Sequence, residues 1–427
     1  MKRILFISFF SPPIGSGGGE RVTKLLKYLD SFEKYLLTSD YPTYKYKDDF
    51  FRIPEDVKVY RVLFKDPRVF IPKFLYKFLK KNQKEEKDIV EKYKTIPQSL
   101  ATKIRLLFFI PDDKIRWVKD SKKISEKIVD DNKIDIVITT SPPHSTHLLG
   151  LNLKQKKNIK WVMDLRDLWT ENPFVLYPEK VKAVNLKFEE RCLRECDLII
   201  VVTESFKKVL LEKFNFLKEE KIKVVHIGFD LDDFKVEPKN LPGFSITYAG
   251  SFYSLQTPVF FLKAFKELLN ENEEFKKEAK VYILAPFEDN VNRIVNELEL
   301  NKSVFVSGFI PHKDAISYIL GSKLLFLFLG KGGEVTIPQK TYEYLGSGKR
   351  ILATITDGEC KEILKKCGVV DIVSPDDVEG IKKLLLKIYK EYKENKTINY
   401  NKNNISEFSM EKISKKFINS LIEGGVL

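Results

Sequence analysis

Residues 324–353 read LLFLFLGKGGEVTIPQKTYEYLGSGKRILA, and they show most clearly how the chain is built. An apolar run, Leu324–Phe328, is followed by a glycine-rich loop and by Pro338, a residue that is favoured in the first turn of a helix. A second apolar run, Arg350–Ala353, follows the helical segment. Short apolar runs that alternate with helices are typical of parallel strands buried on both faces. The stretch therefore predicts a strand–helix–strand unit of a parallel sheet.

The same alternation of apolar runs and helical stretches extends towards both ends of the chain. In the N-terminal half the predicted strands are Ile4–Phe9, Lys34–Leu37, Val57–Val62, Ile134–Thr139, Lys160–Met163, Leu198–Val202 and Lys223–His226. In the C-terminal half they are Ser245–Ala249, Val281–Leu284, Val304–Ser307, Leu324–Phe328, Arg350–Ala353 and Val369–Val373. Between the two series lies Asp230–Gly243, a polar stretch with two prolines, which is the predicted linker.

Two such series predict an α/β protein with two Rossmann-like, doubly wound parallel-sheet domains. A chain of 427 residues is also too long for one ordinary core. We expect the first domain at residues 1–235 and the second at residues 243–400, with a helix at 406–422 that packs back on the first. Ligands of open parallel sheets bind at the carboxyl ends of the strands. The expected site is therefore a cleft between the two domains.

The composition restricts the partners and the cofactors. Lysine and arginine (74) outnumber aspartate and glutamate (60), and the net charge of +14 favours anionic partners. The basic residues are dispersed and no nucleic-acid-binding motif is visible, so nucleic acid is not expected. The four cysteines have neither disulfide-scaffold nor metal-site spacing, which indicates reduced thiols. No apolar run approaches the roughly 18 residues that span a bilayer.

The first candidate for chemistry is the glycine-rich turn at residues 11–20, SPPIGSGGGE. Glycines there allow backbone amides to approach a ligand, and a helix N-terminus favours an anion. Gly17 is followed at the third position by Glu20 rather than by glycine or alanine, which argues against a dinucleotide site. The alternative is a tight strand-to-helix turn without a ligand.

Two further candidates follow strands of the first half. His144 and His147 begin a predicted helix three residues apart, so they share a face. The alternative for them is a capped helix start with surface histidines. Asp164, Arg166 and Asp167 leave the carboxyl end of the strand at 160–163, where they form a buried network, substrate contacts or both.

The fourth candidate is the loop and helix at residues 330–349. Backbone amides at the helix start, assisted by Lys340, suit a diphosphate. Glu343 lies one turn further along the helix and suits the two hydroxyls of a ribose. The alternative is an ordinary capped and exposed helix.

These features occur in an order that resembles family 4 glycosyltransferases, in the form found among surface-polysaccharide enzymes. The stretch Ile337–Ala353, IPQKTYEYLGSGKRILA, resembles the donor-binding signature of that family. Other segments resemble further signatures of the same group: Phe109–Trp117, Ser141–His147, Asp164–Trp169, Tyr248–Ser251 and Val306–His312. The resemblance covers nearly the whole chain.

The resemblance implies the GT-B fold and transfer of a sugar from a nucleotide-sugar donor to a hydroxyl of a glycan acceptor, with retention of configuration. It implies no metal ion and no cofactor. The donor residues that it implies are Gly17, Gly18, Gly250, Ser251, Gly308, Ile310, Gly333, Thr336, Ile337, Lys340 and Glu343. The implied acceptor residues are Asp164, Trp169 and His147. Catalytic roles fall to His144, Asp167, Arg166 and Lys340.

The chain departs from the family pattern in two places. Many members carry an arginine and a lysine after the first strand of the second domain, whereas Gly250–Thr257 has no basic residue. Many also carry two glutamates eight positions apart, but Glu334 and Glu343 are nine apart. Lys331 and Lys340 are the candidates to replace the missing cations. The alternative function is a nucleotide-sugar epimerase or a non-catalytic nucleotide-sugar-binding homologue.

The partners that we expect are a nucleotide-diphosphate sugar and a glycan acceptor, which is lipid-linked in one version of the hypothesis. Residues 68–118 contain clustered lysines beside apolar side chains, a pattern that suits an anionic membrane surface. The alternative is a helical hairpin docked on its own domain. The expected location is the cytoplasm, with peripheral attachment to the inner face of the cell membrane as an open alternative.

Overall fold

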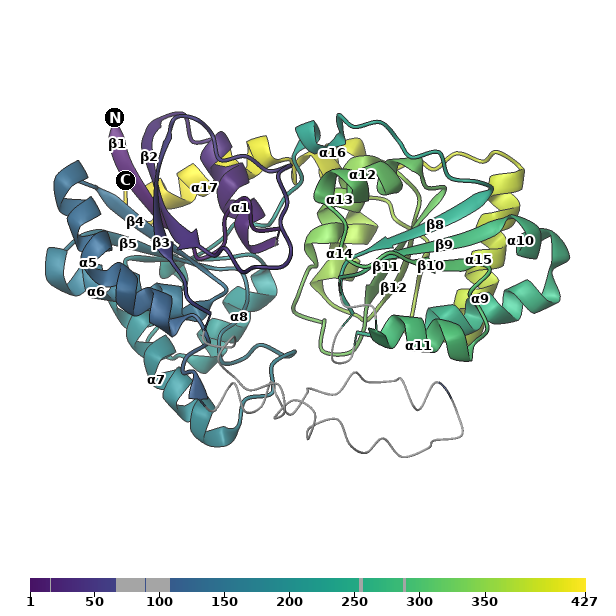
Figure 1. Cartoon of the computed structure of the whole chain (residues 1–427), viewed down its shortest axis with the longest axis horizontal. Helices are drawn as coiled ribbons and strands as arrows, with labels where there is room; N and C mark the ends of the chain where they lie inside the picture. The colour runs from purple at the N-terminus through teal and green to yellow at the C-terminus, as the bar shows by residue number, and fades with distance from the viewer. Residues whose placement is uncertain (16, 67–88, 90–107, 253–255, 287–288) are drawn as a thin grey trace. The chain divides into compact units, whose positions relative to one another are not determined.

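The computed structural model describes residues 1–15, 17–66, 89, 108–252, 256–286 and 289–427 (Figure 1). The chain divides into two compact units, and each has a parallel sheet of its own. Unit 1 consists of Met1–Asn82, Gln98–Ile227 and Met410–Leu427, and unit 2 consists of Gln83–Pro97 and Gly228–Ser409. Each unit is described by itself.

Unit 1 is built on a seven-stranded sheet in the order β3-β2-β1-β4-β5-β6-β7, and every neighbouring pair is parallel. The strands are β1 (Lys2–Ile7), β2 (Phe32–Asp40), β3 (Val57–Leu63), β4 (Ile136–Ser141), β5 (Lys160–Leu165), β6 (Leu198–Val201) and β7 (Ile222–Val224). The order of the strands reverses between β1 and β4, and such a switch point opens a crevice at the carboxyl edge of the sheet.

Helices cover both faces of this sheet (Figure 1). They are α1 (Gly17–Lys27), α5 (Ile115–Asn132), α6 (His147–Lys157), α7 (Glu179–Glu195), α8 (Glu204–Lys213) and α17 (Met410–Glu423). The last of these comes from the C-terminus of the chain. Its Ile413, Phe417 and Leu421 lie in one buried cluster with Ile4 and Phe6 of β1. The apolar positions of α17 recur at helical spacing, so a single face of it closes the core of unit 1.

Unit 2 repeats the same plan with a six-stranded parallel sheet in the order β10-β9-β8-β11-β12-β13. Its strands are β8 (Phe244–Ala249), β9 (Ala279–Leu284), β10 (Val304–Val306), β11 (Leu324–Leu329), β12 (Ile351–Ile355) and β13 (Ile372–Val373). Here the order reverses between β8 and β11. The carboxyl ends of these two strands therefore border the crevice of unit 2.

The helices of unit 2 complete its two outer layers. They are α9 (Val259–Glu271), α10 (Glu273–Glu278), α11 (Asp289–Glu297), α12 (His312–Gly321), α13 (Gln339–Ser347), α14 (Glu359–Lys366), α15 (Val378–Lys393) and α16 (Lys402–Ser406). One large apolar cluster joins the sheet to α9, α11 and α15. On the other side α12 contacts β8 and α13 contacts β11. The helix that carries Lys340 and Glu343 thus follows directly from the strand beside the switch point.

The prediction of two doubly wound parallel-sheet domains is confirmed, and each predicted strand corresponds to an observed one. Helix α5 begins at Ile115, and Trp117 and Val118 are buried within its first turn. The predicted linker also carries structure: Leu231–Phe234 form a 3-10 turn, and the amide of Lys239 donates to the carbonyl of Ser317 on α12.

The segment at residues 68–118, in which the sequence suggests an interfacial region, lies outside the described residues except for 89 and 108–118. Within the described part of the chain, no helix combines the length and the apolar character that a membrane span requires.

Candidate donor and acceptor sites

In unit 2 the site is centred on Lys340, the second residue of α13. Its ammonium donates a hydrogen bond of 2.6 Å to the hydroxyl of Tyr248 and lies 3.9 Å from the centre of that ring. Among the described residues no carboxylate forms an ion pair with it. Burial lowers the pKa of Lys340 from 10.5 to about 7, although the nearby Glu343 raises it. Within the described part of the chain, Lys340 therefore lies at the switch point without an ion-pair partner.

Gly250, directly after β8, makes room for this cation. Its φ is +134°, a conformation that side chains disfavour, and a Cβ there would lie 2.3 Å from the Lys340 Nζ. Gly250 and Lys340, both predicted donor residues, are thus brought together. Ser251 follows, and its carbonyl accepts a hydrogen bond of 3.1 Å from the Tyr248 hydroxyl.

We expect Gly250→Ala to displace the Lys340 ammonium and to lower the affinity for inorganic pyrophosphate by about tenfold, the value of one charge-assisted hydrogen bond. The matched control is Gly348→Ala, because Gly348 also has a positive φ, +67°, but nothing lies within 4 Å of its Cβ position. Isothermal titration calorimetry measures both affinities. Equal losses in the two variants would show that backbone strain, rather than the collision with Lys340, causes the effect.

The loop between β11 and α13 is a tight turn. The amide of Gly333 donates to the carbonyl of Gly330, and the amide of Thr336 donates to that of Gly333, both over 3.0 Å. A Cβ on Gly333 would lie 2.4 Å from the Leu329 side chain, so only glycine fits. Ile337 is buried beneath the turn. The turn leads directly into α13. The N-cap residue of this helix is Pro338, and no side chain accepts a hydrogen bond from the first amides.

The amides of Gln339 and Lys340, at the first two positions of α13, have no helical carbonyl before them to bond, as in every helix, whereas the amide of Thr341 donates to the carbonyl of Pro338 over 2.9 Å. Because no side chain caps them, they suit an anion, which the helix dipole also favours. Glu343 is 7% exposed and accepts a hydrogen bond of 3.1 Å from Gln339, one turn before it. Helix α13 thus brings Lys340, Glu343 and free amides to one edge of the sheet.

Gln256 links the two loops at the switch point. Its side-chain oxygen accepts a hydrogen bond of 2.9 Å from the amide of Gly330, and its side chain is 5% exposed. The side-chain nitrogen has no partner among the described residues. A buried amide without a partner is costly, so this group is available to an oxygen atom of a ligand.

Gly308 and Ile310 lie in the loop that joins β10 to α12. Gly308 is buried with φ +71°, and Ile310 is half-buried. The ring of His312, the first residue of α12, lies 3.7 Å from the Asp233 carboxylate. The assignment of this loop to the nucleotide base stays a prediction.

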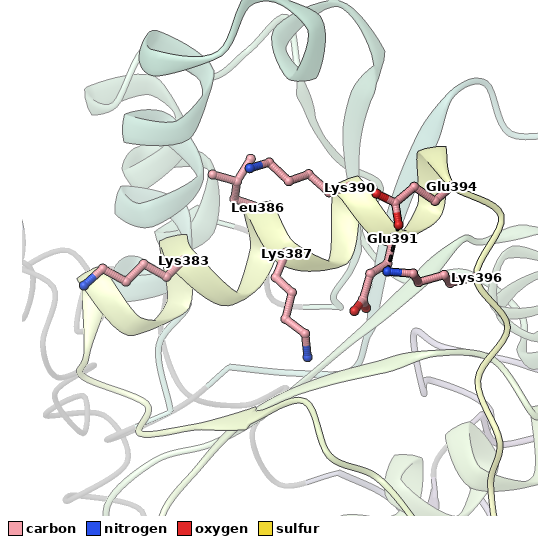
Figure 2. A pocket seen from close by; sticks show the side chains of 7 residues that line it. All are labelled: Lys383, Leu386, Lys387, Lys390, Glu391, Glu394 and Lys396. Carbon is pink, nitrogen blue, oxygen red and sulfur yellow. Dashed lines mark ion pairs between the residues drawn. The ribbon is translucent and has the colours of Figure 1, made fainter.

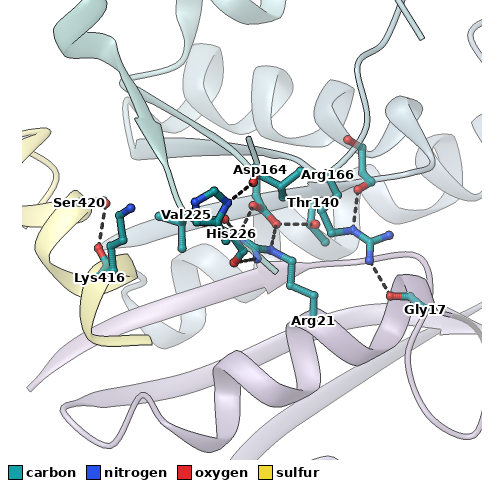
Figure 3. A network of polar contacts seen from close by, with 11 residues as sticks. Gly17, Arg21, Thr140, Asp164, Arg166, Val225, His226, Lys416 and Ser420 are labelled. Carbon is teal, nitrogen blue, oxygen red and sulfur yellow. Dashed lines mark hydrogen bonds and ion pairs between the residues drawn. The ribbon is translucent and has the colours of Figure 1, made fainter. Parts of the chain in front are cut away.

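In unit 1 the equivalent edge is held together by a buried ion pair that the sequence did not predict (Figure 3). The guanidinium of Arg21 on α1 lies 3.2 Å from the Asp164 carboxylate at the end of β5, and both side chains are 1% exposed. Arg21 also donates to the carbonyls of Val225 and His226, and the Thr140 hydroxyl donates to Asp164. The pair therefore joins α1, β4, β5 and the chain after β7.

Asp164 is one of the predicted acceptor residues, and the structure gives it this internal role. Its carboxylate belongs to a buried network, because Arg21 and Thr140 bond to both of its oxygens. Acceptor binding by Asp164 stays a prediction.

The side chain of Arg166 forms a hydrogen bond to the glycine-rich turn. Its side chain is 9% exposed and donates to the carbonyls of Ser141, over 2.9 Å, and of Gly17, over 2.6 Å (Figure 3). Burial lowers its pKa, which Asp167 and Asp164 raise. Gly17, exposed, and Gly18, half-buried, form the first turn of α1. Arg166 thus fixes the start of the helix at which an anion was expected.

The two histidines are buried rather than exposed at the surface. His144 lies in a 3-10 turn before α6, 8% exposed, with its ring stacked on Trp169 at 5.1 Å. His147 is 0% exposed, and its Nδ1 lies 2.8 Å from the Thr139 hydroxyl, which also accepts from the Trp161 ring nitrogen. Burial lowers both pKa values, that of His144 to about 3, so both rings are neutral.

Two of the quoted N-terminal signatures meet at Asp112. Its carboxylate accepts from the amide of Ser145, over 2.8 Å, and from the Ser145 hydroxyl, over 2.7 Å, so it caps the turn that carries His144. Burial raises the pKa of Asp112 and also that of Asp167, which is half-buried. The catalytic roles of His144, Asp167 and Arg166 and the acceptor roles of His147 and Trp169 stay predictions.

A cavity of about 410 Å³ lies along α15 (Figure 2). Four lysines and two glutamates border it, and Glu394 pairs with Lys396 over 2.7 Å. Glu391 pairs with Arg350, which directly precedes β12. The cavity therefore lies towards the amino edge of the sheet, opposite the edge at which ligands of such folds bind. It is not part of the candidate donor site.

Sequence reasoning missed three residues of these sites. Tyr248 and Gln256 flank the Gly250 loop, where Gly250 and Ser251 were the predicted donor residues. The signature Tyr248–Ser251 includes Tyr248 but gave it no role. Nothing in the sequence pairs Arg21 with Asp164, because 143 positions separate them.

Comparison with known proteins agrees with this geometry. Residues 89–233 match the family model described as Glycosyltransferase Family 4. Over this segment the chain resembles glycosyltransferases of family 4. A search of the curated proteins finds no match to its sequence. The resemblance to family 4 glycosyltransferases is confirmed.

The predicted GT-B fold is confirmed by solved structures that match over nearly the whole chain. Sucrose-phosphate synthase from Thermosynechococcus elongatus is 14% identical, with a TM-score of 0.66, and 98% of each chain is covered. A trehalose-6-phosphate protein from E. coli bound with UDP-2-fluoro glucose is 12% identical, with a TM-score of 0.63, over 98% of this chain and 99% of that one.

An enzyme with a different activity has the same fold. UDP-GlcNAc 2-epimerase from Methanocaldococcus jannaschii is 14% identical to this chain, with a TM-score of 0.55, over 99% of both chains. At these identities the likeness describes the fold alone, so the reaction is argued from the residues of the site.

Proposed function

We propose that this glycosyltransferase moves a sugar from a nucleoside-diphosphate sugar to a hydroxyl of a glycan acceptor, with retention of configuration and without a metal ion. The observation that supports the proposal is the Lys340 ammonium beside the uncapped start of α13. Departure of a nucleoside diphosphate develops negative charge, and stabilising such charge is commonly the largest catalytic contribution. Lys340, the α13 amides and the Gln256 side chain are the groups that unit 2 offers for it.

The donor half of the proposal has further support. Glu343 lies one turn beyond Lys340 and is nearly buried, a place that suits two hydrogen bonds from a ribose. A similar fold was solved with UDP-2-fluoro glucose, a nucleotide sugar. We infer that Lys340 and the amides bind the diphosphate and that Glu343 binds the ribose.

The acceptor half depends on unit 1. We propose that the glycine turn at Gly17 and the neutral His144 face the acceptor, with Asp167 as the second group that positions its hydroxyl. The net charge of +14 suits a phosphate-containing, lipid-linked acceptor at the inner face of the cell membrane. This finer version of the proposal includes peripheral attachment to that membrane.

Thermal shift with a panel of nucleotide sugars tests the donor, since a ligand that binds only the native state raises the melting temperature. For the donor found in this way we expect Glu343→Ala to weaken binding by about 10- to 100-fold, because hydrogen bonds to a buried carboxylate are lost. Glu334→Ala, at an exposed residue of the same loop, is the control. Wild-type affinity in Glu343→Ala would reject its assignment to the ribose.

Product analysis separates transfer from epimerisation. An epimerase converts the nucleotide sugar without an acceptor, whereas the proposed transferase releases a nucleoside diphosphate only as glycoside forms. Conversion of the donor into an epimer without any acceptor would contradict the proposal.

A further inference from the structure

Tyr248 is held rigidly under the candidate donor site. It is the penultimate residue of β8, and its side chain is 2% exposed. Its ring stacks on Phe252 with centroids 4.1 Å apart and an interplanar angle of 13°, and Phe326 lies against it at 5.8 Å. A ring packed in this way cannot turn its hydroxyl elsewhere without repacking the core.

The hydroxyl of Tyr248 stands between a cation and a carbonyl. It accepts from the Lys340 ammonium over 2.6 Å and donates to the Ser251 carbonyl over 3.1 Å. An ammonium has only donors, and a phenol has one proton. The bond from Lys340 to Tyr248 is stronger when the donor is a charged ammonium than when it is a neutral amine, so the chain of bonds from Lys340 to Tyr248 to Ser251 favours the charged form of Lys340.

We propose that Tyr248 is a positioning residue for Lys340: its hydroxyl fixes the ammonium at the diphosphate site and keeps it charged without a carboxylate partner. This proposal rests on the proposed function, because Lys340 is there the group that faces the diphosphate. A carboxylate in place of the phenol would neutralise the cation and compete with the ligand. A neutral hydroxyl holds the cation and leaves its charge for the phosphate oxygens.

The groups near Lys340 are consistent with this role. Burial disfavours the ammonium, and of the charged groups Glu343, on the next turn of α13, favours it. Tyr344, on the same helix, is engaged elsewhere, because its hydroxyl accepts from the amide of Ala249 over 2.9 Å. Removal of the Tyr248 hydroxyl takes away a bond to the charged form, which lowers the pKa of Lys340.

Tyr248→Phe tests the proposal, because it removes the hydroxyl and keeps the stacked ring. We expect the pKa of Lys340 to fall by about one unit, as loss of one charge-assisted hydrogen bond predicts. NMR of lysine side chains labelled with ¹³C and ¹⁵N measures it, and the spectrum of Lys340→Met assigns the signal. The control is Tyr389→Phe, which removes an equally buried hydroxyl, bonded to Glu278, elsewhere in unit 2.

Binding of inorganic pyrophosphate gives a second readout. At pH 8 we expect about tenfold weaker binding in Tyr248→Phe than in the wild type, and little difference at pH 5.5, where Lys340 is charged in both. The ionisation of pyrophosphate is common to all variants and cancels in the comparison. In a Lys340→Met background, Tyr248→Phe should have no further effect, since Tyr248 acts through Lys340.

The outcomes are distinguishable. An unchanged pKa of Lys340 in Tyr248→Phe, or an equal loss of affinity with and without Lys340, would overturn the positioning role. A lowered pKa together with wild-type protein that does not bind pyrophosphate would support the link between Tyr248 and Lys340 and reject the proposed diphosphate site.

Discussion

Replacement of Lys340 by methionine is expected to lower kcat by about 100- to 1,000-fold, the usual cost of removing one group that stabilises developing charge in a transition state. Methionine keeps the length of the side chain and removes the cation. The ammonium has no ion-pair partner among the described residues, so no ion pair competes with the leaving diphosphate for it. Steady-state rates with the donor identified by thermal shift measure the effect.

Lys331→Met is the matched control for this prediction. Lys331 was the second candidate cation in the sequence, but it is exposed in the loop after β11. Surface charges contribute little to a buried reaction centre. If Lys331→Met loses as much activity as Lys340→Met, the cation that faces the diphosphate has been assigned to the wrong residue.

The pH dependence follows from the same lysine. Its pKa is about 7 in the folded protein and 10.5 when unperturbed, so between these values the unfolded chain binds the additional proton. The stability contributed by neutral Lys340 is therefore complete above pH 10.5 and is lost as the pH falls through 7. Lys340→Met should be more stable than the wild type below pH 7, with a difference that shrinks towards pH 10.5. Chemical denaturation followed by circular dichroism measures this window.

The affinity for an anion depends on pH in the opposite direction to the stability. An anion that needs the ammonium binds best below pH 7 and raises the pKa of Lys340, so the protein takes up a proton as pyrophosphate binds. Calorimetry in two buffers with different ionisation enthalpies detects this uptake. Lys340→Met should show less uptake, since the remaining change comes from the ligand.

The second large effect is expected from the ion pair in unit 1. Arg21→Met leaves the Asp164 carboxylate buried and uncompensated, which costs about 3–5 kcal/mol of unfolding free energy. Asp164→Leu should cost a similar amount of unfolding free energy, because it leaves the guanidinium of Arg21 buried without its counter-charge. The double variant, Arg21→Met with Asp164→Leu, should recover most of the loss, as two apolar side chains of similar volume replace the pair.

The three tryptophans make this measurement specific. Trp117, Trp161 and Trp169 all lie in unit 1 with 0% exposure, so tryptophan fluorescence reports the unfolding of that unit. The control is Arg194→Met, which breaks an exposed pair with Glu190 and should change the free energy by less than about 1 kcal/mol. Equal destabilisation by Arg194→Met and Arg21→Met would contradict the role of the buried pair.

The sequence by itself determined the two parallel sheets. Runs such as LLFLFL at β11 are apolar on both faces, and only a strand covered by helices on both sides buries them. It also placed Lys340 and Glu343 on one helix after the strand at 324–328, because a glycine-rich loop and the proline before a helix are local signals. Gly250 came only from the resemblance to a family.

Only the tertiary structure decided which polar groups meet. Tyr248 and Lys340 are 92 positions apart, and Arg21 and Asp164 are 143 apart, so no periodicity links them. Burial of His144 and His147 likewise arises from packing against Trp169 rather than from their spacing. Local patterns fix how a segment folds because backbone geometry is local, whereas charge partners and pKa values depend on side chains that come together only when the sheets assemble.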